Sequence, residues 1–76
     1  MKDILLTFEY NDVDENLEIH ANKQGLKFPK RQIEKLEVNN TNFHLITSSW
    51  GGDELSEEKQ GENNKLINHV KIFHWE

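Results

Sequence analysis

Residues 43–56 read Phe43-His44-Leu45-Ile46-Thr47-Ser48-Ser49-Trp50-Gly51-Gly52-Asp53-Glu54-Leu55-Ser56. Apolar and polar side chains alternate in the first half of this stretch, and a period of two residues predicts a β-strand over residues 42–49. Trp50 follows, and then Gly51 and Gly52, which can adopt positive φ angles and so allow a sharp turn. We therefore expect a strand that delivers Trp50 to a sheet edge, where the chain turns.

Four carboxylates come directly after this turn. They are Asp53, Glu54, Glu57 and Glu58. A run of exposed acids is most often only a solvated loop, but this one lies beside a tryptophan, a residue type enriched at interface hot spots. Trp50 is either a plug at one end of a small core or an anchor for a partner, and the two roles are compatible. We take Trp50 and the four acids as candidate partner contacts, with Gly51 and Gly52 as the structural turn.

Outside this stretch, hydrophobic periodicity predicts three more strands and one helix. The strands are expected at residues 3–10, 17–21 and 65–75. The helix is expected at about residues 23–37, with Asn22 as a candidate N-cap. Pro29 leaves two alternatives, because the helix either starts at Lys23 and is kinked or irregular before Pro29, or has Pro29 as its first residue. The order β-β-α-β-β predicts an α+β fold, a two-layer sandwich in which one helix covers one face of a four-stranded, mostly antiparallel sheet.

The same alternation predicts which side chains are buried. Leu17, Ile19 and Ala21 should point inward from the second strand. The strand at 65–75 has apolar residues on both faces, so the face without the helix should expose apolar surface, which is typical of a partner site or a dimer interface.

Composition limits the class of protein. A chain of 76 residues, of which 34% are hydrophobic, should form one small domain, residues 1–76, with a small core. It has no cysteine, and therefore no disulfide or thiolate metal site. A net charge of −5 argues against a nucleic-acid partner, although residues 19–38 are basic between acidic flanks, which favours electrostatic steering of a partner. The chain shows no signal peptide and no membrane-spanning stretch, so we expect a cytoplasmic protein.

Three histidines are the strongest candidates for chemistry. If Ile19, Leu45 and Val70 face the helix, then His20, His44 and His69 point together to the open face of the sheet. Three imidazoles can bind zinc, but no ligand spacing matches a metal motif, and the sequence contains no nucleophile elbow, phosphate loop or paired-carboxylate signature. We expect no metal, no cofactor and no enzymatic activity.

The segments His44–Ser56 and Ile67–Trp75, with Gly61 between them, resemble the immunity protein 32 family, small cytosolic antidotes of bacterial polymorphic-toxin systems. The similarity covers about residues 17–75, and the pattern Trp-Gly-Gly-x-Glu-Leu is its most specific part. Upstream, Glu18-Ile19-His20 and Lys23-Gln24-Gly25-Leu26 also fit, whereas Pro29 and Lys30 depart from the family pattern. The resemblance implies a non-enzymatic protein that binds and neutralises a cognate toxin, often a nuclease.

Three functions follow as hypotheses. The first is an immunity protein whose acidic surface occludes a basic toxin site, because charge complementarity gives fast capture. The second is a small metal-dependent or hydrolytic domain that uses the histidine face. The third is a structural homodimer that joins its sheets through the strand at 65–75, which is compatible with toxin binding.

Overall fold

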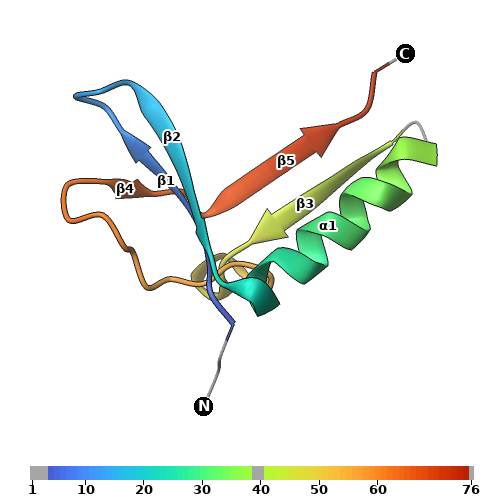
Figure 1. The fold of residues 1–76 in the computed structure, drawn as a ribbon, viewed down its shortest axis with the longest axis horizontal. Helices are drawn as coiled ribbons and strands as arrows, with labels where there is room; N and C mark the ends of the chain where they lie inside the picture. Colours follow the sequence, from blue (N-terminus) through green and yellow to red (C-terminus); the bar gives the residue numbers. More distant parts are fainter. Residues whose placement is uncertain (1–3, 39–40, 76) are drawn as a thin grey trace.

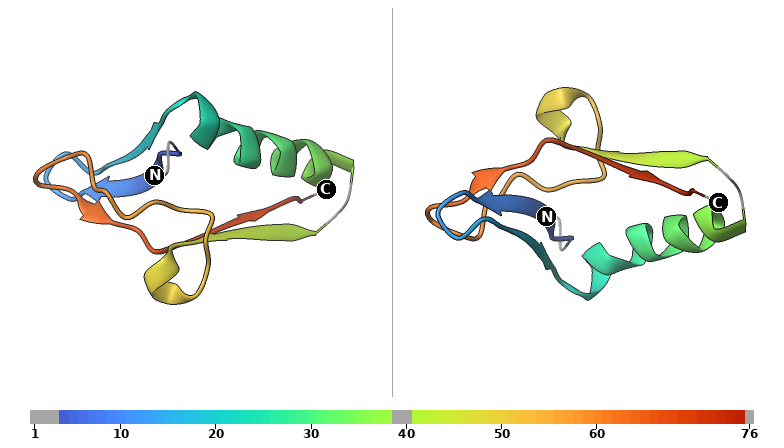
Figure 2. Two further views of the ribbon diagram at one scale, coloured as in Figure 1. Left: turned by 90° about the horizontal axis from the view of Figure 1, so that it is seen from below. Right: turned by 90° about the horizontal axis from the view of Figure 1, so that it is seen from above.

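The computed structural model describes residues 4–38 and 41–75 (Figure 1). Its elements are β1 (Leu6–Asn11), β2 (Asn16–Ala21), α1 (Lys23–Val38), β3 (Asn42–Ile46), the 3-10 helix η1 (Ser48–Trp50), β4 (Lys65–Leu66) and β5 (His69–Phe73). The strands pair antiparallel, and α1 lies over the β3–β5 pair (Figure 2). The prediction of an α+β fold with one α-helix and antiparallel pairing is confirmed.

The expected single four-stranded sheet is wrong, because the strands form two sheets. One has the order β2-β1-β4, and the other consists of β3 and β5. The predicted strand at 65–75 is divided between them at residues 67–68. Ile67 N–H donates to the carbonyl of Phe8 in β1 at 2.8 Å, whereas the carbonyl of Asn68 accepts from Thr47 N–H, just after β3, at 3.0 Å. Two adjacent residues are thus bonded to different sheets, so the ladder cannot continue through them.

The third strand is shorter than the expected 42–49, since β3 ends at Ile46. The carbonyl of Thr47 accepts hydrogen bonds from both Trp50 N–H and Gly52 N–H at 3.0 Å, which winds the next residues into η1. Gly51 ends η1 in the left-handed region with φ +96°, so the predicted glycine turn is confirmed at Gly51. It is the only glycine of the described residues with a positive φ.

The left-handed conformation of Gly51 makes a specific mutational prediction. No atom lies within 4 Å of the position that a β-carbon on Gly51 would take, so a side chain there meets backbone strain without a steric clash. We expect Gly51→Ala to lower the free energy of unfolding by about 1 kcal/mol. Gly51→Asn should cost less, because asparagine tolerates this region better. Chemical denaturation measures both, and equal stability of the alanine variant and the wild type would contradict the strain.

The helix begins at Lys23, as the first of the two alternatives predicted, and Pro29 lies buried inside it. Asn22 is its N-cap: the side-chain oxygen accepts from Gly25 N–H at 2.8 Å. The same oxygen accepts from Leu5 N–H at 3.1 Å, and Asn22 N–H donates to the carbonyl of Leu5 at 3.1 Å. The cap therefore also fixes the helix start against the chain that enters β1.

The core joins both sheets and is small. Its buried apolar residues are Leu6 and Phe8 of β1, Leu45 of β3, and Leu55 of the loop after η1. The expectation that Leu17 and Ile19 are buried is wrong, because 57% and 55% of these residues remain exposed. The reason is the position of β2, which is the outermost strand of its sheet, and an open groove separates Ile19 from Leu26 and Ile33 of α1.

Candidate functional site

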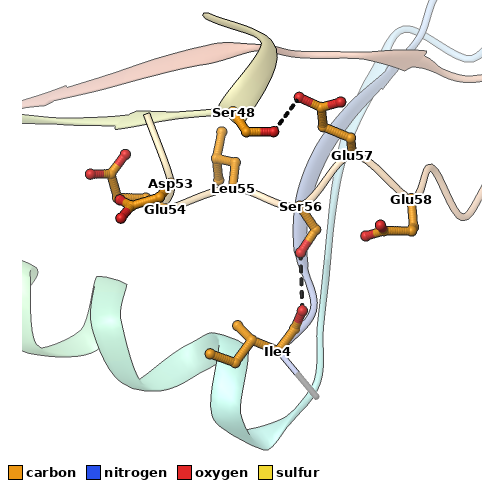
Figure 3. Close-up of a pocket in the computed structure, with 8 residues that line it drawn as sticks. All are labelled: Ile4, Ser48, Asp53, Glu54, Leu55, Ser56, Glu57 and Glu58. Carbon is orange, nitrogen blue, oxygen red and sulfur yellow. Dashed lines mark hydrogen bonds between the residues drawn. The ribbon is translucent and has the colours of Figure 1, made fainter. Parts of the chain in front are cut away.

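The four carboxylates predicted as partner contacts line one pocket (Figure 3). The pocket has a volume of about 350 Å³, and its other walls are Ile4, Ser48, Leu55 and Ser56. Ser56 fixes the loop to β1, since its backbone N–H donates to the carbonyl of Leu6 at 2.8 Å and its Oγ accepts from Leu6 N–H at 3.1 Å. The sequence pattern of residues 53–58 is typical of a solvated loop, but hydrogen bonds hold this segment against β1. We call this the acidic pocket.

Two of the four carboxylates also stabilise the fold. Glu54 Oε1 accepts from Ile46 N–H at 3.1 Å, and Glu57 Oε2 accepts from Ser49 N–H at 2.6 Å and from Ser48 Oγ at 3.0 Å. Hydrogen bonds from Ser49, and then from Ser48, hold the pKa of the Glu57 carboxyl below its ordinary value. Glu54 and Glu57 therefore hold the folded chain together in addition to lining the pocket.

Asp53 and Glu58 differ from these two. Both are exposed, and their carboxylates accept no hydrogen bond from the described part of the chain. They line the acidic pocket without an internal role, so their charge is available to a partner. Any test of the pocket by charge removal should therefore use these two residues.

Trp50 ends η1, which Glu57 holds through Ser48 and Ser49. The Trp50 residue is 61% exposed, so it does not plug the core. Its role as a partner anchor stays a prediction, and the geometry is suitable because the element that carries Trp50 is bonded directly to a wall of the acidic pocket.

The structure brings together only two of the three predicted histidines. His44 Nδ1 and His69 Nε2 lie 2.8 Å apart on the β3–β5 sheet, with ring centroids 4.9 Å apart. His20 lies on the other sheet, where its Nε2 is 2.9 Å from Glu18 Oε1 and 4.0 Å from Glu9 Oε1. The expected three-histidine face is wrong, since the division of the chain into two sheets separates His20 from the pair.

A buried carboxylate on β1 was not predicted as a functional or structural centre. Glu9 is 0% exposed. Its Oε1 accepts from Gly61 N–H at 2.9 Å and Asn64 Nδ2 at 3.0 Å, and its Oε2 accepts from Thr7 Oγ1 at 2.6 Å and Gln60 N–H at 2.8 Å. Burial raises the pKa of Glu9, but these four hydrogen bonds outweigh burial and lower the pKa to about 2. Glu9 is therefore an ionised anchor that holds the loop at residues 60–64 over the sheet.

Glu9, Glu18 and His20 place three potential metal-ligand atoms within 4.8 Å of one another. An ionised carboxylate offers about four lone-pair sites, and four protein donors already use those of Glu9. Glu18 accepts from Asn64 Nδ2 at 3.0 Å and also contacts His20. A cation would have to displace several of these donors, so the cluster has the chemistry of a structural network rather than of a metal site.

No protein-family model matches this chain, and no curated protein or solved structure matches it. Among the described residues, no helix is long and apolar enough to cross a membrane.

Proposed function

We propose that this protein is a non-enzymatic immunity protein that binds a toxin domain through the acidic pocket and Trp50. One observation carries the proposal: four acidic residues line a single pocket, and an exposed tryptophan lies on the element bonded to its wall. The resemblance of residues 44–56 and 67–75 to immunity protein 32 sequences supports the same function.

The acidic pocket is suited to a lysine or arginine side chain. Ile4 and Leu55 offer apolar walls for the aliphatic stem. The carboxylates around them can accept charge-assisted hydrogen bonds from the cationic end. A toxin that acts on nucleic acid needs a basic active site, so a bound acidic pocket would compete with the phosphate backbone for the same surface.

The charge of the pocket predicts a kinetic effect. Asp53→Asn together with Glu58→Gln removes two charges without removing a hydrogen bond of the fold. We expect slower association with the cognate toxin domain, and a weaker salt dependence, because exposed interface charges act mainly on the association rate. Stopped-flow binding at low and high salt measures this effect.

The matched control removes two exposed charges from the β1–β2 turn, with Asp12→Asn and Asp14→Asn. This control should associate faster than the pocket variant at low salt. If the two double variants associate at equal rates, only net charge matters and the acidic pocket is not the docking site.

Trp50 should act on dissociation instead. In the same assay, Trp50→Ala should accelerate dissociation by at least about thirtyfold, which corresponds to the 2 kcal/mol of an interface hot spot. Trp75→Ala is the control, because Trp75 is also exposed but stacks on Phe73 beyond β5. A dissociation rate unchanged by Trp50→Ala would remove Trp50 from the interface.

A further inference from the structure

β2 is an edge strand with an unused outer side. It pairs with β1 in an unbroken register from Leu6↔Ala21 to Asn11↔Asn16, and in the sheet order β2-β1-β4 it has no second neighbour. Within residues 4–38 and 41–75, no backbone hydrogen bond reaches its outer side. Such an edge presents a row of N–H and C=O groups, which is a template for pairing with another strand.

Two of the other edge strands carry features that oppose strand addition, and the third, β3, is covered at its last residue. β4 has only two residues and includes Lys65, and β5 has Lys71 at its centre. At the end of β3, the N–H of Ile46 donates to Glu54 Oε1, and its carbonyl accepts from Glu54 N–H and Leu55 N–H. Short strands, edge lysines and covering loops are the usual protections of an edge. β2 has six residues, without lysine or proline, and lacks all three protections.

We propose that β2 pairs antiparallel with β2 of a second copy of this chain, with the two-fold axis at Ile19. The two three-stranded sheets would then form one continuous sheet across the dimer. A symmetric pair of this kind is an isologous interface, in which the same residues of both copies meet. The proposal is independent of toxin binding and uses a different surface from the acidic pocket.

The sequence of β2 is self-complementary in this register. Directly opposite residues of an antiparallel pair point to the same face. An axis at Ile19 sets Ile19 opposite itself and Leu17 opposite Ala21, all on the apolar face of the strand. On the other face it sets Glu18 opposite His20, so a carboxylate meets an imidazole.

The neighbouring registers are worse. An axis at Glu18 sets two carboxylates directly opposite each other, which is destabilising. An axis at His20 sets two imidazoles opposite each other and shortens the paired stretch, because β2 ends at Ala21. An axis that falls between two residues would pair Ile19 with Glu18 or His20, so the apolar face of one copy would lie beside the polar face of the other. The axis at Ile19 is therefore the register that the side chains favour.

The apolar face of β2 borders a groove that a second copy would cover. The groove has a volume of about 510 Å³, and its walls come from β1, β2, α1 and β5, including Ile19, Leu26, Ile33 and Ile72. Ile19 and Leu17 are each more than half exposed. A second β2 would bring its own Ile19 and Ala21 beside these side chains, so the dimer removes apolar surface from water in both copies.

The oligomeric state is the first test. Sedimentation equilibrium of the wild type should give twice the mass of the 9.0-kDa chain. Ile19→Lys should give the monomer mass with an unchanged circular dichroism spectrum, because Ile19 is half exposed and not needed in the core. Val38→Lys makes the same change at another exposed apolar residue, at the end of α1, and should remain dimeric. A wild-type monomer, or a dimer that survives Ile19→Lys, would overturn the proposal.

Disulfide cross-linking then tests the register. The chain has no cysteine, so any disulfide that forms must involve the introduced thiol. Ile19→Cys should cross-link to itself under mild oxidation, because directly opposite Cα atoms lie about 4.5–5.5 Å apart, within the disulfide range. Leu17→Cys alone should not cross-link, whereas an equal mixture of Leu17→Cys and Ala21→Cys should give a mixed dimer. Cross-linking of Leu17→Cys alone at the rate of Ile19→Cys would exclude this register and overturn the proposal.

Discussion

Glu9→Gln is expected to lower the free energy of unfolding by roughly 2–5 kcal/mol, because a buried hydrogen-bond donor left without an acceptor costs about 1–3 kcal/mol. Each carboxylate oxygen of Glu9 accepts from two donors. Glutamine replaces one oxygen with an NH₂ group, so at least the Gln60 N–H would face another donor, while the Thr7 hydroxyl can turn to accept. The remaining hydrogen bonds would also lose the charge that strengthens them. A domain of this size has a total stability of only about 5–10 kcal/mol, and this one change would remove a large part of it.

Denaturation by urea measures the loss. Glu62→Gln is the matched control, because it makes the same chemical change in the loop that covers Glu9, at an exposed residue. The control should remain within about 0.5 kcal/mol of the wild type. A Glu9→Gln variant as stable as the Glu62→Gln control would mean that the network does not hold the loop.

The same carboxylate predicts a dependence of stability on pH. The pKa of Glu9 is lowered from 4.5 to about 2 in the folded state. A lowered pKa stabilises the fold above pH 4.5, and this stabilisation is lost as the pH falls from 4.5 toward 2. A pKa difference of this size corresponds to about 3 kcal/mol. The loss between pH 5 and pH 2 should therefore be smaller in Glu9→Gln than in the wild type, and equal losses would contradict the lowered pKa.

Gly25→Ala should be the second strongly destabilising change. In an ordinary helix, alanine is about 1 kcal/mol more favourable than glycine. Here a β-carbon on Gly25 would overlap the carbonyl oxygen of Leu5 and lie 2.6 Å from its carbonyl carbon. These are backbone atoms, so either α1 or the start of β1 must shift, and the hydrogen bonds between Asn22 and Leu5 would be lost. We expect the free energy of unfolding to fall by about 3 kcal/mol, at the upper end for overpacking.

Gln24→Ala provides the comparison, since Gln24 is exposed in the same helical turn. Thermal melts of both variants measure the difference. Gln24→Ala should be neutral or slightly stabilising, because only helix propensity changes. A Gly25→Ala variant that also gains stability would show that the helix and β1 can separate without cost.

Local signals in the sequence predicted the local structure. Asn22 as a cap, the helix that follows it, and the glycine turn after Trp50 each depend on residues within a few positions, and each is confirmed. The grouping of Asp53 with Glu58 in one pocket also follows from their closeness in the sequence. Features of this kind are predictable because the interacting groups are covalent neighbours.

Features that depend on distant residues were not predictable. Glu9 alternates with Phe8 in a strand, which is the pattern of a solvent-facing acid, and its donors Gln60, Gly61 and Asn64 lie more than fifty residues away. The sequence around residues 67–68 gives no signal that residues 65–75 are divided between two sheets, because the apolar alternation continues through Ile67 and Asn68. Hydrophobic periodicity identifies a strand but not its partner.

The junction at residues 67–68 has a consequence for how the chain folds. The β1–β2 hairpin needs only a short turn, and β3 and β5 are separated by residues 47–68, so each pair closes a shorter loop than the contact between Phe8 and Ile67 does. The hydrogen bond between Phe8 and Ile67 instead joins the two ends of the described chain. Closing a loop of that length lowers the chain entropy before the stabilising contacts form. Proteins dominated by such distant pairings fold in milliseconds to seconds rather than microseconds. The docking of the two preformed halves at Ile67 and Asn68 is thus the step expected to limit the folding rate.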